Sequence, residues 1–197
     1  MIRMHRCTTS CVVAAALVVA GCGGGDGGSR PIAGEPTALP PDPGDAGRAT
    51  VAGVDSDADG VRDDIQRYIA TTQAASPPTR AALRQHARAQ QRLLLDAAER
   101  DKSYANATAL GHAIDCVYFV RRGLGRADHA RLVNELRAEF VNTEARTAAL
   151  LRADAQLGGR EFAGDFGNIR AHCAFDTAGL PDRPDNDTDN DDDDEDD

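Results

Sequence analysis

The residues with the clearest chemistry lie in one short acidic stretch before the helical part of the chain. Carboxylates stand at every second position of this stretch, and Gly60 follows the third of them. Alternating carboxylates in a tightly turning loop can surround one hard cation, and calcium takes about six to eight oxygen ligands. We therefore predict a calcium site formed by four side chains and, at the valine, a backbone carbonyl: Asp55, Asp57, Asp59, Val61 and Asp63.

The spacing of these residues also resembles a known class of calcium loop. The alternating carboxylates, the glycine and Asp63 match positions one, three, five, six and nine of an EF-hand-type pattern. Gln66 stands at position twelve, where that pattern has glutamate, and residues 46–54 show no entering helix. The stretch more closely resembles the isolated calcium loops of dockerin and thrombospondin type 3 repeats. This resemblance implies calcium binding, and the absent glutamate predicts a dissociation constant of about 0.1–1 mM.

A helix start is an alternative explanation for part of this stretch. Asp59 could cap a helix over residues 63–71, and Asp63 and Asp64 would be favourable near the positive end of its dipole. Neither role accounts for the first two carboxylates of the stretch, which repel each other when no cation is bound. Both interpretations stay open at the level of the sequence.

A pair of cysteines in the second half of the chain is a second chemical feature. In an oxidising compartment, Cys116 and Cys173 predict a disulfide that closes a loop of about 58 residues and contributes about 2–4 kcal/mol. The alternative is a Cys2His2 zinc site, because His112 lies one helical turn before Cys116 and His172 adjoins Cys173. Exported thiols are usually oxidised, which favours the disulfide.

The start of the chain has the composition of an export signal. Arg3 and Arg6 precede an apolar run over residues 11–20, which small residues and a cysteine follow. The run of about ten residues is roughly half of what a membrane-spanning helix needs, so the segment predicts a cleaved signal peptide over residues 1–21.

The end of this signal, VAGC at residues 19–22, resembles the lipobox of bacterial lipoproteins. The resemblance implies acyl chains on Cys22 and therefore attachment of the mature protein to a membrane, because several chains anchor stably. In enteric bacteria an aspartate after the cysteine retains lipoproteins in the inner membrane. Gly23 stands there, so the resemblance favours the outer membrane, facing the periplasm. The alternative is an ordinary signal cut near Ala20, which would release a soluble protein.

Composition divides the mature chain into three parts. Residues 22–49 are rich in glycine and proline and predict a flexible linker after the lipidated cysteine. Residues 181–197 contain eleven acidic residues and one arginine, a net charge of −10 that equals that of the whole chain. Such a block of like charges predicts a disordered tail. The folded domain is therefore predicted at residues 50–180, with no net charge.

The apolar residues of this domain recur at helical spacing, and no stretch alternates as a strand would. Pro77 and Pro78 suit the start of a helix, and Ser76 could cap it. We therefore predict an all-α fold, a small bundle of four to five helices. The expected segments are residues 63–71, 79–100, 105–122, 127–157 and, more briefly, 160–174.

No sequence motif identifies an enzyme. The chain lacks GxSxG, HExxH and Walker A motifs, and it has no basic patch that would predict nucleic acid as a partner. An anchored helical domain with a structural calcium loop predicts a non-enzymatic module that contacts an envelope protein. The alternatives are an envelope hydrolase whose active site is assembled by the fold, and a low-affinity buffer of divalent cations that uses the loop and the tail.

Overall fold

The computed structural model describes residues 38–162 and 168–180 of the chain. The predicted all-α class is confirmed, since these residues form five α-helices and no strand. The predicted signal peptide, Cys22 and the tail at residues 181–197 lie outside the described residues. The α-helices and two 3-10 helices run in the order η1 (Gly44–Arg48), α1 (Asp63–Thr72), α2 (Pro77–Leu95), α3 (Arg100–Val120), α4 (Arg126–Phe140), α5 (Glu144–Leu157) and η2 (Ile169–His172).

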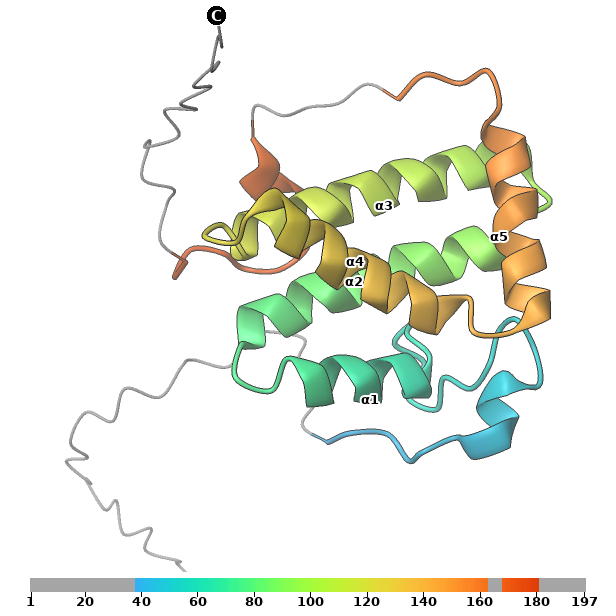
Figure 1. Ribbon diagram of the computed structural model, residues 1–197, viewed down its shortest axis with the longest axis horizontal. Helices are drawn as coiled ribbons and strands as arrows, with labels where there is room; N and C mark the ends of the chain where they lie inside the picture. Colours follow the sequence, from blue (N-terminus) through green and yellow to red (C-terminus); the bar gives the residue numbers. More distant parts are fainter. Residues whose placement is uncertain (1–37, 163–167, 181–197) are drawn as a thin grey trace, which may run out of the picture.

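The two longest helices, α2 and α3, form an antiparallel hairpin on which the other helices pack (Figure 1). Ser76 caps α2 by accepting a hydrogen bond from the amide of Thr79 at 3.4 Å. Asp96 orders the turn between the helices, because its carbonyl accepts from Ser103 Oγ at 3.2 Å and its carboxylate accepts from Asn106 Nδ2 at 2.9 Å. These local contacts order the turn between the two helices of the hairpin.

The prediction of a single helix over residues 127–157 is wrong, because this part of the chain forms two helices, α4 and α5. Thr143 stops the continuous helix by acting as the N-cap of α5, where its hydroxyl accepts from the amide of Arg146 at 3.3 Å. A threonine that bonds to the backbone in this way favours a helix start over a helix interior. Figure 1 shows the consequence, since α4 lies across the hairpin and α5 runs steeply to it at one end.

The core lies between the hairpin and the helices packed on it. Its apolar side chains come from α1 to α5, and each of the larger ones is almost fully buried. They include Ile65, Ile69, Leu83, Leu94, Val117, Leu136, Phe140 and Leu150. Within the described ranges, no helix is both long and apolar enough to cross a membrane.

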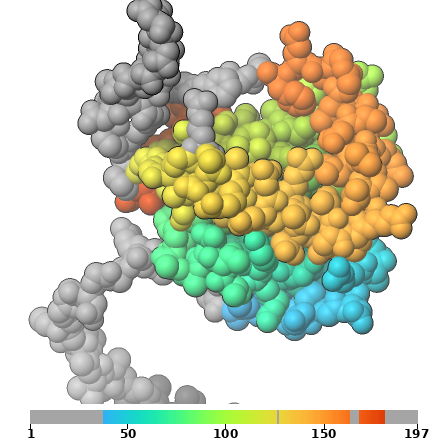
Figure 2. Space-filling model, viewed as in Figure 1, coloured from blue at the N-terminus to red at the C-terminus, as the bar shows by residue number. Residues whose placement is uncertain are grey.

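The folded domain begins earlier than the composition predicts. Residues 38–49 belong to the predicted linker, but they include η1 and pack on the helices (Figure 2). The buried Arg146 of α5 donates hydrogen bonds to the carbonyls of Gly47 and Thr50, and Arg67 of α1 donates to the carbonyl of Pro40 at 2.9 Å. The composition did not reveal this docking, because the contacts use backbone carbonyls and every residue type carries one.

Candidate metal site in the aspartate loop

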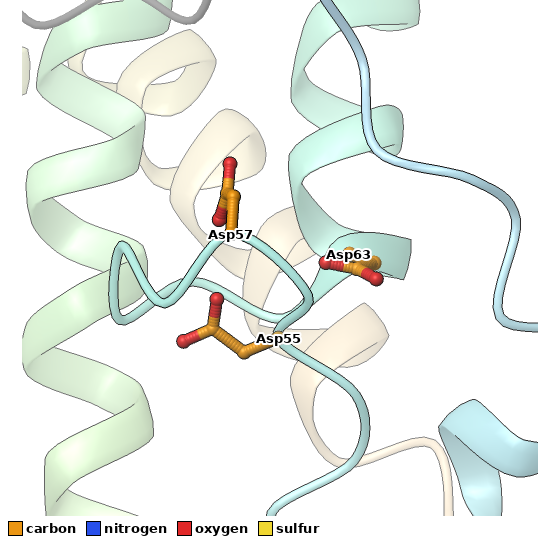
Figure 3. A group of neighbouring side chains, drawn as sticks. All are labelled: Asp55, Asp57 and Asp63. Atoms are coloured by element: carbon orange, nitrogen blue, oxygen red, sulfur yellow. The ribbon is translucent and has the colours of Figure 1, made fainter.

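The aspartate loop, residues 55–62, connects this N-terminal segment to α1 and reaches across to α2 (Figure 3). Its two ends are held together, because the amide of Asp63 donates to the carbonyl of Val54 at 2.8 Å. The chain turns sharply at Gly60, whose φ of +84° lies in the left-handed region that favours glycine. The predicted role of this glycine therefore matches its backbone conformation.

Three of the predicted ligand side chains meet in this loop. Carboxylate oxygens of Asp55, Asp57 and Asp63 lie within 4.8 Å of one another and could hold a metal ion. The first two are exposed on the loop, whereas Asp63 is fully buried at the first turn of α1 (Figure 3). Two carboxylates of the group are thus exposed to solvent, whereas the third is buried in the protein.

Hydrogen bonds shape the exposed half of this group. Asp55 accepts from the amides of Gly60 at 2.9 Å and Asp59 at 3.2 Å. Partial burial raises the pKa of Asp55, and the nearby Asp59 charge adds to the rise against the effect of the Gly60 amide. Burial also acts to raise the pKa of Asp57, but hydrogen bonds from the Gln66 side chain and the Asp59 amide outweigh it and lower the pKa. The loop is therefore built to hold Asp57 as a carboxylate.

The buried half contains two oxygens that the protein leaves unpaired. Asp63 Oδ1 accepts from the amide of Ser56 at 2.9 Å, but Asp63 Oδ2 is buried and has no hydrogen-bond partner among the described residues. Gln66, which is 2% exposed, donates through Nε2 to Asp57 Oδ2 at 3.2 Å, and its Oε1 is likewise buried without a partner. An unpaired buried acceptor costs about 1–3 kcal/mol, and more when it is charged.

Asp59 does not lie with the other three aspartates. Its Oδ2 faces α2, where it forms an ion pair with Arg84 and lies 3.5 Å from Arg88 Nη2. Arg88 also donates through Nε to the Asp59 carbonyl at 2.8 Å. Asp59 Oδ1 accepts from the amide of Val61 at 2.7 Å. The predicted fifth-position ligand therefore ties the loop to α2, while the Val61 side chain is buried in the core.

The helix-cap alternative is confirmed in part, because Asp63 and Asp64 lie in the first turn of α1 as it expects, but Asp59 is not the cap. The N-cap residue of α1 is Arg62 rather than Asp59, and no side chain forms the cap hydrogen bond. Asp64 receives two hydrogen bonds from the buried Arg62 guanidinium, at 2.9 and 3.0 Å. The same guanidinium donates to the carbonyls of Phe140 and Glu139 at the end of α4. Arg62 thus joins the start of α1 to the end of α4, and its ion pair with Asp64 holds the guanidinium in place.

The base of the loop depends on residues for which the sequence alone gave no signal. Gly53 has a φ of +66°, and a Cβ there would lie 2.6 Å from Arg62 Cδ and 2.9 Å from Arg146 Nη2. The two buried arginines thus leave room only for a glycine. Gln91 of α2 secures the same segment by donating to the carbonyl of Ala52 at 3.1 Å.

The predicted cysteine pair lies outside the aspartate loop, on α3 and directly after η2. Cys116 and Cys173 form a disulfide that fastens the segment of η2 to α3. The rings of His112 and His172 stack with their centroids 4.1 Å apart, and His172 Nδ1 lies 2.9 Å from Asp115 Oδ2. In this state the two sulfurs are bonded to each other and do not serve as zinc ligands.

The gathered carboxylates of the aspartate loop could hold a cation through their oxygen atoms. Protein-family models, curated proteins and solved structures were all compared with the chain, and none of them matches it.

Proposed function

We propose that the chain is a lipid-anchored protein of the bacterial cell envelope, whose helical domain serves as a non-enzymatic interaction module with a structural calcium ion in the aspartate loop. The observation that carries the calcium site is the buried, unpaired Asp63 Oδ2 beside two further carboxylates. Three negative charges at this distance repel one another, and a bound cation removes both the repulsion and the unpaired oxygen.

Calcium suits this group better than other common ions. All the gathered donors are oxygens, which hard cations prefer, whereas zinc and copper favour nitrogen and sulfur. Magnesium demands near-ideal octahedral geometry, while calcium accepts the irregular arrangement that a short loop offers. The open side of the group leaves room for water molecules to complete the coordination.

Gln66 would supply a further ligand at position twelve. A half-turn of its amide exchanges Nε2 and Oε1, so that the oxygen instead of the nitrogen faces Asp57 and the ion. The resulting set is three carboxylates and one neutral amide oxygen. The amide cannot replace a bidentate glutamate, so a dissociation constant of about 0.1–1 mM is expected. Asp59 would keep its ion pair with the arginines of α2 and would affect calcium binding only through the shape of the loop.

The ion would stabilise the junction between residues 38–62 and the helices. At about 10 mM calcium, a dissociation constant of 0.1–1 mM corresponds to about 1.4–2.7 kcal/mol of added stability. The loop lies between the docked segment of residues 38–49 and α1. Calcium would therefore set how firmly that segment is held on the helices.

A calcium titration of the mature chain tests the site, with calorimetry and thermal melts in parallel. Asp63→Asn keeps the shape and the hydrogen bond to Ser56 but removes the buried charge, so it should fold and lose the saturable calcium response. Asp154→Asn, an exposed carboxylate of α5, is the matched control and should retain it. The acidic tail is present in both variants, so the difference isolates the loop. Equal responses in both variants would rule the site out.

Anchoring and partner binding need separate tests. Cys22→Ser should abolish incorporation of labelled palmitate and move the protein from the membrane to the soluble fraction. Failure to incorporate palmitate in the unaltered chain would contradict the anchor. Crosslinking of the anchored protein in intact cells should capture an envelope protein, and the interaction role is wrong if no such protein is captured.

A further inference from the structure

Arginines gather at the end of the hairpin where α3 ends and η2 packs against it. The Cζ atom of Arg122 lies 4.8 Å from the centre of the Phe119 ring, and that of Arg170 lies 5.7 Å from the centre of the same ring. Arg121 precedes Arg122 directly after α3, and all three arginines are partly exposed. We call these three side chains, Arg121, Arg122 and Arg170, the arginine cluster.

Hydrogen bonds to the protein fix the position of this cluster. Arg122 Nη1 donates to the carbonyl of Phe119 at 3.2 Å. Arg170 donates through Nε to Thr177 Oγ1 at 3.1 Å and through Nη2 to the Thr177 carbonyl at 2.7 Å. Arg121 Nε is buried and has no hydrogen-bond partner among the described residues. Three positive charges are thus held at one place on the surface, where a negatively charged segment lowers their mutual repulsion.

The opposite end of the hairpin is charged differently. There Lys102 Nζ lies 2.8 Å from Glu99 Oε1, and Arg160 Nη2 lies 2.8 Å from Asp101 Oδ1. Cations and carboxylates are therefore interspersed around the turn between α2 and α3. An acidic segment meets charges of its own sign at that end, which makes the arginine cluster the better partner for it.

The acidic tail, residues 181–197, follows directly on a segment that is held at this cluster. Thr177, which Arg170 binds, also accepts through its carbonyl from the amide of Leu180 at 2.9 Å. Figure 1 shows the described chain ending at the end of the hairpin where α2 begins and α3 ends. The first tail carboxylate is that of Asp182, and five residues span at most about 18 Å from Thr177. The tail therefore starts within reach of the arginine cluster.

We propose that the arginine cluster is an interaction surface for residues 181–197 of the same chain. The tail carries eleven acidic residues and one arginine, and the rest of the chain has no net charge. A guanidinium can bind a carboxylate through two parallel hydrogen bonds. Because the tail is tethered beside the cluster, its effective concentration there is about millimolar, so that even weak ion pairs are populated. The tail covers the cluster, and an acidic segment of another protein reaches it only by displacing the tail.

Paramagnetic relaxation in the full chain tests the contact. A nitroxide is attached at Asn190→Cys in the tail, and serine replaces Cys7, Cys11 and Cys22. Without divalent cations, the amide signals of the cluster should broaden at least about fivefold more than those of α5, which lies at the other end of the molecule (Figure 1). Raising the salt from about 0.1 M to about 1 M shortens the Debye length from about 10 Å to about 3 Å and should remove the difference.

Two results of this measurement would overturn the proposal. One is equal broadening of the cluster and of α5, because a tail with no preferred surface samples both. The other is broadening of the cluster that arises between molecules, which a mixture of nitroxide-labelled chains with isotope-labelled chains detects.

Variants on both sides of the contact separate charge from folding. A neutral-tail variant, with asparagine or glutamine at all eleven acidic positions of residues 181–197, leaves the helical domain unaltered and should lose most of the broadening. Arg121→Gln combined with Arg122→Gln should reduce it at least about threefold, because an ion pair needs both charges. Arg152→Gln, an exposed arginine of α5, is the matched control and should leave it unchanged. Broadening that survives in the neutral-tail variant, or that the control reduces equally, would contradict the proposal.

A synthetic peptide of residues 181–197 tests whether the chain's own tail occupies the cluster. The peptide should shift the amide signals of the cluster in the neutral-tail variant at a concentration at least about tenfold lower than in the unaltered chain, where the tethered tail competes. Equal responses of the two chains would show that the tail leaves the cluster open.

Discussion

The aspartate loop and the segment of η2 are both attached to the hairpin of α2 and α3, but by different kinds of interaction. The loop is held on α2 by the ion pair between Asp59 and Arg84 and by the hydrogen bond from Arg88 to the carbonyl of Asp59. The segment of η2 is held on α3 by a covalent bond. The first attachment therefore depends on charge, whereas the second depends on a covalent bond that reduction can break, together with two hydrogen bonds with Gln85 of α2.

The largest expected effect on stability comes from adding a Cβ at Gly53, just before the aspartate loop, where the packing leaves no room for it. Gly53→Ala places a Cβ against two buried arginines at a positive φ, so the variant should lose about 2–5 kcal/mol of unfolding free energy. Gly111→Ala is the matched control, because nothing lies within 4 Å of its Cβ and it stands within α3, where alanine should add up to about 1 kcal/mol. Urea denaturation measures both, and an equal effect of the two substitutions would contradict the close packing at Gly53.

Removing the covalent attachment should have the next largest effect. Replacing both Cys116 and Cys173 by alanine should cost about 2–4 kcal/mol of unfolding free energy, because the unfolded chain regains the entropy of a long loop. The calcium response of the variant should stay unchanged, since neither cysteine belongs to the group of aspartates that would hold the ion. Loss of that response together with the disulfide would show that the two attachments are coupled.

Acid should weaken the hairpin that both attachments share. Burial, with a contribution from the nearby Arg137 charge, lowers the pKa of His86 in α2 from its usual value of 6.5 to about 4. Between these values the unfolded chain binds a proton that the folded chain excludes, so stability falls as the pH drops, by about 2 kcal/mol between pH 7.5 and pH 5. His86→Leu should flatten this part of the pH profile, as measured by chemical denaturation. A profile that the substitution leaves unchanged would assign the acid sensitivity to other groups.

The smallest expected effect on stability comes from a substitution that also tests which aspartates of the loop bind calcium. Asp59→Asn removes a partly buried ion pair with Arg84 and should cost about 1–2 kcal/mol of unfolding free energy. Calcium affinity should change less than about twofold, whereas Asp57→Asn should reduce it severely. Calorimetry compares the two variants. If Asp59→Asn abolishes binding, the Asp59 carboxylate must leave Arg84 for the ion.

Several parts of the molecule could be predicted from local sequence because their causes are local. Apolar spacing predicted the helical segments, and Ser76 before two prolines marked the start of α2, where the hydroxyl does cap the helix. The disulfide has no local cause, since its cysteines lie 57 residues apart, and it was predicted instead from an even cysteine pair and the expected oxidising compartment. The break between α4 and α5 also had a local signal, Thr143 as an N-cap, but the continuous apolar pattern over residues 127–157 masked it.

By itself the sequence determined the helical class, the turn at Gly60 and the spacing of the aspartates, because these follow from backbone conformation and short-range periodicity. Only the tertiary structure decided which aspartates meet. Asp63 joins the group because α1 buries it beneath the loop, and Asp59 leaves it because α2 presents Arg84. The docking of residues 38–49 was decided in the same way, since Arg146 reaches carbonyls almost a hundred positions away and no local pattern records such a contact.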